Sequence, residues 1–128
     1  MFYTNREGKV KTTKADYELF EKEVKRWIDF WGLTEWDVSF NHENPRLKDV
    51  DAGTRYSYAD KWVVFGLTDE IHDYEYSKDF VKKCAFHEAA ELLIAELVSL
   101  CQMRTVTDDD IVRAAHCVIM RLQNRVFK

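Results

Sequence analysis

The chain is poor in the residues that interrupt or cross-link a fold: it has 4 Gly, 1 Pro and 3 Cys among 128 residues. It also lacks repeats and low-complexity tracts, which excludes a collagen-like chain and a solenoid. Aromatic residues are plentiful, with 4 Trp, 6 Tyr and 8 Phe, so enough apolar surface exists to offset the entropy of ordering the chain. A chain of this length usually forms one domain. We therefore predict a single domain over residues 1–128.

The chain also has no excess of positive charge. It contains 19 Lys and Arg and 23 Asp and Glu, which give a net charge of -4. A nucleic-acid partner usually requires a cationic face, so we expect none. The long apolar stretch over residues 84–101 is interrupted by His87, Glu88, Glu91 and Glu96, which argues against a membrane span. No secretory signal pattern opens the chain. We expect a soluble protein with no membrane partner.

The three cysteines, Cys84, Cys101 and Cys117, are odd in number and lie in helix-like apolar patterns. Such cysteines are more often buried thiols in a reducing compartment than members of a disulfide framework. This pattern predicts a cytoplasmic protein.

Hydrophobic periodicity predicts an α+β fold. Apolar residues at helical spacing run over residues 14–31 behind the potential caps Thr12 and Thr13, and Gly32 follows where a helix commonly ends. Residues 36–41, 53–58 and 62–67 have strand patterns, the last two forming a hairpin. Residues 77–103 are apolar on nearly every face and predict a central buried helix. Thr107 caps a final helix over residues 108–127, so the order is helix, three strands, helix, helix.

The polar residues of the central helix form the candidate site. His87 and Glu91 are four residues apart and therefore share a helix face, and Glu88 lies beside them. An imidazole and a carboxylate one turn apart can reach a single divalent cation, and a third ligand with a water would complete a tetrahedral zinc site. His116, at the edge of the apolar face of the last helix, is the candidate third ligand, with Asp109 in reserve.

The segment over residues 85–93, Ala-Phe-His-Glu-Ala-Ala-Glu-Leu-Leu, resembles the HExxH helix of small zincin-like metallopeptidases, in particular the minigluzincins and the short zincin-like proteins of bacteriophages. The order of the predicted elements is similar to theirs, a leading helix, a small sheet, the motif helix and a closing helix. The resemblance implies a zincin-like domain from a phage or mobile element. It also implies His87 as first ligand and Glu88 as the general base.

The motif departs from the family at two ligand positions. Glu91 stands where the second His is expected, and the residues around His116 are Ala114, Ala115 and Cys117 instead of including a Glu ligand. A carboxylate at position 91 can still bind zinc, but its charge should weaken the metal's ability to acidify a bound water. We expect zinc to be absent or weakly bound.

Two functions remain open. In the first, the metal site has degenerated and the zincin-like scaffold binds another protein without catalysis, and the polar cluster persists because removing one member would leave the others without hydrogen-bond partners. In the second, the chain is a zinc-dependent metallopeptidase or other hydrolase with His87, Glu91 and His116 as ligands and Glu88 as base. We favour the first, because catalysis tolerates few changes among metal ligands whereas a fold tolerates many.

Overall fold

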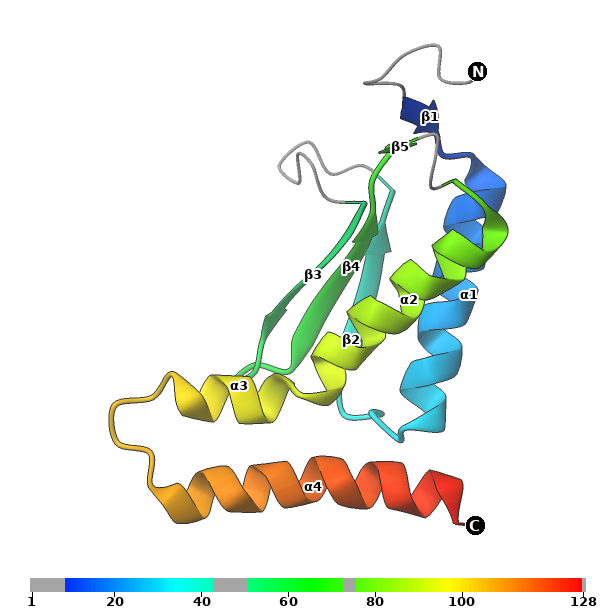
Figure 1. Cartoon of the computed structure of the whole chain (residues 1–128). Coiled ribbons are helices and arrows are strands. Elements are labelled where there is room, and N and C mark those ends of the chain that lie inside the picture. Colours follow the sequence, from blue (N-terminus) through cyan, green and yellow to red (C-terminus); the bar gives the residue numbers. More distant parts are fainter. Residues whose placement is uncertain (1–8, 43–50, 73–75, 128) are drawn as a thin grey trace.

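The computed structural model describes residues 9–42, 51–72 and 76–127, and these form an α+β fold as predicted (Figure 1). The helices are α1 (Lys14–Phe30), α2 (Lys78–Leu93), α3 (Ala95–Cys101) and α4 (Asp108–Val126). The strands are β1 (Lys9–Lys11), β2 (Asp37–Asn41), β3 (Ala52–Ser57), β4 (Trp62–Leu67) and β5 (Glu70–His72).

The three predicted strands form one mixed sheet in the order β2-β4-β3. β3 and β4 are antiparallel, which confirms the predicted hairpin, and Lys61 takes a positive φ of 57° in the turn between them. β2 runs parallel to β4, and β4 is therefore the central strand with one parallel and one antiparallel neighbour. A second, two-stranded sheet of β1 and β5 was not predicted, because strands of three residues carry too little alternation to recognise.

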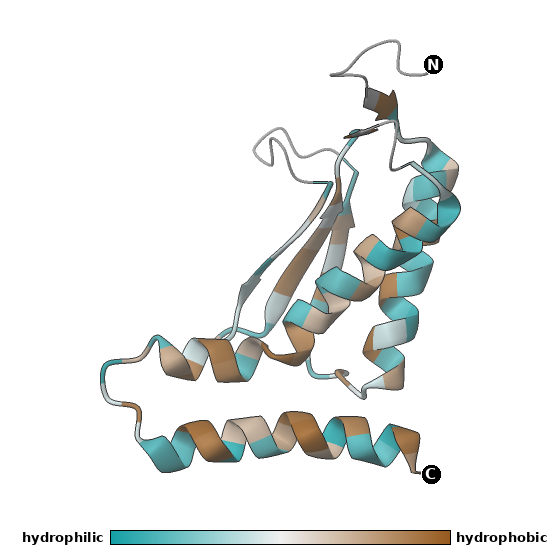
Figure 2. Cartoon of the chain, in the orientation of Figure 1, coloured by the Kyte–Doolittle hydropathy of each residue, from teal (hydrophilic) through white to brown (hydrophobic). Residues whose placement is uncertain are grey.

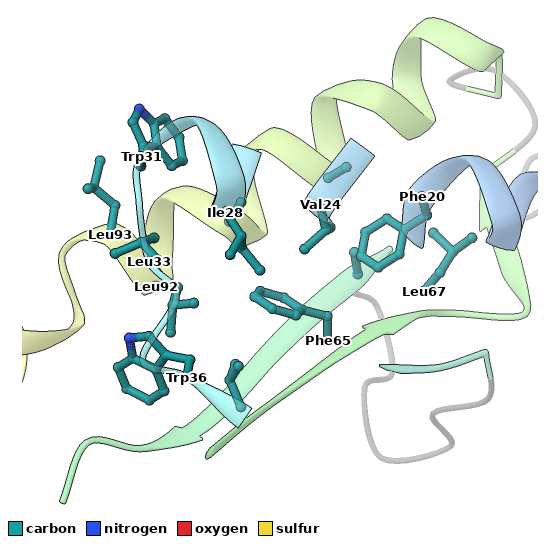
Figure 3. Close-up of a cluster of buried hydrophobic side chains, with 14 of the residues drawn as sticks. Phe20, Val24, Ile28, Trp31, Leu33, Trp36, Phe65, Leu67, Leu92 and Leu93 are labelled. Carbon is teal, nitrogen blue, oxygen red and sulfur yellow. The ribbon is translucent and has the colours of Figure 1, made fainter. Parts of the chain in front are cut away.

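The fold has two layers, with α1 and α2 side by side over one face of the three-stranded sheet (Figure 1). Alternate residues of β4 point toward the helices and are fully buried, namely Val63, Phe65 and Leu67. Figure 3 shows Phe65 beneath Val24 and Ile28 of α1. α2 packs against α1, and its residues Ala85 and Ala89 are both fully buried. The core therefore lies between the sheet and this helix pair.

The sequence signals that bound α1 act as predicted. The Thr13 hydroxyl accepts a hydrogen bond from the backbone N–H of Asp16, and the Asp16 carboxylate accepts one from the backbone N–H of Thr13. This capping box satisfies donors that the first helical turn leaves unpaired. After the helix, Gly32 has a φ of 67°, the left-handed conformation that glycine adopts without steric cost.

The predicted central helix over residues 77–103 is wrong in two respects, and the first is that it is two helices. α2 ends at Leu93, Ile94 breaks the run, and α3 continues from Ala95. The helix is also not buried on every face, since 45% of Phe86 and 39% of Ile94 are exposed. Uniformly apolar sequence conceals such a break, because no Gly, Pro or cap residue marks it.

The prediction of buried cysteines is also wrong. Cys101 and Cys117 are exposed, and Cys84 is half-buried on α2. The helical apolar pattern around Cys117 belongs to α4, much of whose apolar surface is uncovered. No helix within the described ranges has the length and hydrophobicity to cross a membrane.

α4 lies beside α3 at the end of the molecule away from β1 and β5 (Figure 1). Two arginines attach it to the last turn of α1 and to the two residues that follow it. Arg121 donates hydrogen bonds to the carbonyls of Trp31 and Gly32, at 3.2 and 2.9 Å, and Arg125 donates one to the carbonyl of Asp29 at 3.0 Å. α4 is thus held by polar contacts near its C-terminal end and by apolar contacts along one edge.

Candidate functional site

The buried stripe of α2 includes one carboxylate. Its apolar members recur at helical spacing, at Val81, Ala85, Ala89 and Leu92, and Glu88 lies in the same stripe with only 5% of its surface exposed. An ionised carboxylate in such a position requires a hydrogen-bond partner. The burial of Glu88 therefore depends on a hydrogen-bond donor from the sheet.

That partner is Thr54 of β3. Inward-facing residues alternate along this strand, and Thr54 shares the inner face with the buried Ala52. Its hydroxyl lies 2.7 Å from Glu88 Oε1 as donor, and it also lies 3.3 Å from the Glu88 backbone carbonyl. Sequence reasoning did not identify Thr54, although its place two residues after an inward-facing alanine could have suggested that it faces the motif helix.

Burial changes the acidity of Glu88. The pKa of its carboxyl is raised from an ordinary 4.5 to about 7, chiefly because the group is buried. The nearby Glu91 carboxylate also acts to raise the pKa, while the Thr54 hydrogen bond and His87 act to lower it. A carboxyl with a pKa near neutrality is suited in principle to accept or donate a proton.

His87 and Glu91 lie on a different face of α2 from the buried stripe. His87 Nε2 is 3.3 Å from Glu91 Oε2, and the two side chains are 71% and 47% exposed. An exposed pair of this kind contributes little to stability. The prediction that these two residues share a helix face is confirmed, and their exposure means that the core does not require them to be polar.

The structure brings together three of the predicted site residues and not the fourth. One potential ligand atom from each of His87, Glu88 and Glu91 lies within 4.8 Å of the others. Among the residues that the structure describes, His116 and Asp109 are not members of this group; both are exposed on α4. Their role as ligands stays a prediction without support from the geometry.

The donor chemistry of the group permits a divalent cation, but these three described residues alone do not supply every part of a catalytic zinc site. Imidazole and carboxylate are ordinary zinc ligands. A catalytic site needs three protein ligands, an open position for water, and a separate base. If Glu88 is the base, only His87 and Glu91 remain as ligands in the group; if Glu88 is a ligand, the group contains no base.

An aromatic surface adjoins the group on its exposed side. The Phe86 ring packs edge-on against Trp27, with ring centroids 4.9 Å apart, and against Trp31 at 5.7 Å. Trp27 also contacts Phe30, which is 39% exposed. An open hollow of about 380 Å³ lies here between α1 and α2, and its lining residues are Glu23, Arg26, Trp27, Lys82, Lys83, Phe86 and His87.

In comparisons with known proteins, no family model, curated protein or solved structure matches this chain significantly. The resemblance to zincin-like metallopeptidases therefore rests on the motif and the order of the elements.

Proposed function

We propose that this chain is a zincin-like scaffold that does not catalyse hydrolysis and that binds another protein through the surface beside its altered motif. The observation that carries the proposal is the position of Phe86, a partly exposed aromatic residue next to His87, in a hollow surrounded by cations. We define the Phe86 surface as the seven residues that line this hollow.

The altered site supports the first half of the proposal. The described group offers three donors for tasks that require four, namely three zinc ligands and a base. Glu88 is moreover buried against the sheet by Thr54, whereas His87 and Glu91 point to solvent and contact each other. Hydrolysis with this set lacks either a ligand or a base.

The composition of the Phe86 surface supports the second half. Aromatic rings offer large contact area at low entropic cost and are common at the centre of protein interfaces. Three cations surround the rings, Arg26, Lys82 and Lys83, and the one carboxylate, Glu23, is already paired with Arg26 at 2.9 Å. This surface is therefore positive, although the chain as a whole has a net charge of -4.

Charge complementarity defines the partner. A positive rim around an aromatic centre fits an acidic segment that carries an aliphatic or aromatic side chain. The apolar side chain of the partner would contact Phe86 and Trp27, and its carboxylates would lie near Lys82 and Lys83. We therefore assign the partner as a protein with an acidic, apolar-containing segment.

Fluorescence anisotropy with labelled peptides tests this function. The probe is a peptide of alternating Glu and Leu, and the comparison peptide has Lys in place of Glu. We expect the acidic peptide to bind the wild-type chain and to lose most of its affinity for Phe86→Ser and for the double variant Lys82→Glu, Lys83→Glu.

Matched variants control for loss of apolar surface and for net charge. Met103→Ser changes another exposed apolar residue, and Lys11→Glu with Lys14→Glu makes the same change in net charge on exposed lysines elsewhere. Both controls should bind the acidic peptide as the wild type does. Failure of the wild type to bind it, or binding that Phe86→Ser leaves intact, would contradict the proposal.

A zinc-dependent hydrolase is the second candidate, and the proximity of His87, Glu88 and Glu91 favours it. His87 and Glu91, with His116 as the predicted third ligand, would hold a zinc ion that would supply Lewis acidity, and Glu88 would take the proton of the attacking water. Hydrolysis of a peptide substrate that is abolished by Glu88→Gln, in protein with stoichiometric zinc, would establish this function in place of the first.

A further inference from the structure

A cavity of about 220 Å³ lies between α4, the junction of α2 and α3, and the turn that joins β3 to β4. Its apolar wall includes Leu33, Trp36 and Leu92, which Figure 3 shows together at one end of the core. Figure 2 shows brown, hydrophobic segments at the end of α2 and along α3 and α4, the helices around this cavity. The cavity therefore combines an apolar wall with a few polar groups, as ligand sites do. Its polar and charged lining residues are Glu35, Tyr58, Lys61, Glu96, Cys117 and Arg121.

The cavity wall already holds one cation of the chain itself. The ammonium group of Lys61 lies 3.3 Å from the centroid of the Tyr58 ring and 5.1 Å from the centroid of the Trp36 ring. The faces of aromatic rings carry negative charge density, so an ammonium group at these distances is attracted to both rings. The centroids of the two rings are 6.2 Å apart. Trp36 and Tyr58 therefore form a cation-binding surface on the cavity wall.

Two carboxylates make the same wall negative. The Tyr58 hydroxyl donates a 2.8 Å hydrogen bond to Glu96 Oε2. Burial, this hydrogen bond and the charges of Glu96 and Glu35 raise the pKa of Tyr58 to about 12, so both carboxylates act on the ring. Glu35 lies 3.6 Å from Arg121, whereas no ion pair joins Glu96 to a cation within residues 9–42, 51–72 and 76–127. Glu96 is therefore the carboxylate that can receive an additional cation.

The backbone of Lys61 shows that its ammonium group occupies the wall at a conformational cost. Its φ of 57° lies in the left-handed region, which glycine adopts freely and a residue with a Cβ does not. The contacts of the ammonium group with the two rings offset this cost. An ammonium group that is not attached to the turn could make the same contacts without any strain. Lys61 follows the exposed Ala59 and Asp60, so its side chain can move into solvent.

We propose that this cavity binds a small primary alkylamine, whose ammonium group replaces that of Lys61 over the Tyr58 ring and donates a hydrogen bond to Glu96. Such an amine is protonated at neutral pH, as the lysine side chain is. Its alkyl chain would contact Leu92 and Val118 on the apolar wall. The cavity is smaller than the sites of drug-sized ligands, which measure about 300–1,000 Å³, so the chain is short. This inference is independent of the Phe86 surface, whose residues belong to α1 and α2.

Titration calorimetry of the full chain with n-butylammonium chloride tests the site, because this cation reproduces the end of the lysine side chain. The neutral comparison compound is n-butanol, which has the same alkyl chain. We expect weak binding of n-butylammonium to the wild type, in which Lys61 competes, and binding about tenfold tighter to Lys61→Gly. Lys61→Asn also removes the ammonium group and tolerates the left-handed conformation, so it should bind as Lys61→Gly does. Circular dichroism checks that the variants are folded.

Glu96→Gln, added to Lys61→Gly, tests the recognition of charge. Gln keeps an acceptor for the Tyr58 hydroxyl and removes the negative charge, so the affinity for n-butylammonium should fall about tenfold. Glu70→Gln makes the same change in charge on β5, at the other end of the molecule, and should leave the affinity unchanged. No binding to Lys61→Gly and Lys61→Asn, equal binding of n-butanol, or an affinity that Glu96→Gln does not lower would overturn the proposal.

Discussion

The hydroxyl of Thr54 on β3 donates a 2.7 Å hydrogen bond to the carboxylate of Glu88 on α2. This bond joins the outer strand of the sheet to the motif helix and compensates for the burial of Glu88. The position of Glu88 is therefore set by the packing of α2 on the sheet, and not by the exposed His87 and Glu91.

Replacement of Thr54 by Val should destabilise the protein by about 1–3 kcal/mol at neutral pH, because the buried Glu88 carboxylate loses its hydrogen-bond donor while the shape of the side chain is retained. Urea unfolding measures the change. Thr54→Ser keeps the hydroxyl and should recover most of the stability. A larger loss in Thr54→Ser than in Thr54→Val would mean that the methyl group of Thr54, and not its hydroxyl, stabilises this contact.

The raised pKa of Glu88 predicts a dependence of stability on pH. In the unfolded chain the carboxyl ionises near its ordinary pKa of 4.5, and in the folded chain near a pKa of about 7. Between these values the folded state holds a proton that unfolding releases, so the free energy of unfolding should fall as the pH rises from about 5 to about 7. Glu88→Gln cannot ionise and should lack this fall. Parallel profiles for the two proteins would show that Glu88 titrates normally.

The capping box of α1 predicts the opposite dependence on pH. Asp16 is buried and accepts hydrogen bonds from the Thr13 backbone N–H and the Tyr76 hydroxyl; burial acts to raise its pKa, but these hydrogen bonds outweigh it, and the pKa is lowered. The stability that Asp16 contributes is therefore present above its unfolded pKa and lost as the pH falls through its folded pKa. Asp16→Ala should cost roughly 1–2 kcal/mol at neutral pH.

The second capping box provides the control for Asp16. Thr107 and Asp110 make the same reciprocal bonds at the start of α4, but Asp110 is at the surface, and its third partner is the exposed Arg113 at 3.6 Å in place of the Tyr76 hydroxyl. Asp110→Ala should therefore cost less than Asp16→Ala in urea unfolding. An equal or larger cost at Asp110 would show that burial adds nothing to the contribution of the first box.

Gly32 should resist substitution for reasons of backbone conformation alone. Its φ is 67°, and a Cβ added there would meet only Arg121 Nη1, at 4.0 Å, so space is available. Gly32→Ala should cost about 1 kcal/mol because alanine is strained in the left-handed region, and Gly32→Asn should cost less because Asn tolerates it better. Thermal unfolding of the two variants ranks them, and a larger loss for Asn would point to a steric cause.

The sequence predicted the elements that have strong periodicity or caps. Thr13, Thr107 and Gly32 bound α1 and α4 as expected, and the apolar strand at residues 62–67 is the central strand of the sheet. The division of the central helix at Ile94 was not predictable, because the sequence on both sides is helical and apolar. Strands β1 and β5 were not predicted, because each has only 3 residues and shows no recognisable alternation.

The contacts within α2 were predictable from the sequence, but the contacts between α2 and other elements were not. The i to i+4 spacing of His87 and Glu91 depends only on helix geometry, so their proximity followed from the sequence. Contacts between distant segments depend on packing, and neither the Thr54 bond to Glu88 nor the placement of His116 outside the group could be inferred from spacing. The burial of Glu88 agrees with the prediction of a buried central helix, whereas the exposure of His87 and Glu91 does not.

The zinc content of wild-type protein and of His87→Ala, purified side by side without a tag or chelator, tests the absence of a catalytic metal centre most directly. Because the described group lacks either a third ligand or a base, we predict zinc far below one equivalent per chain in both proteins, with the fold intact. About one zinc per wild-type chain, lost in His87→Ala, would contradict this account and identify a resident metal centre at the motif.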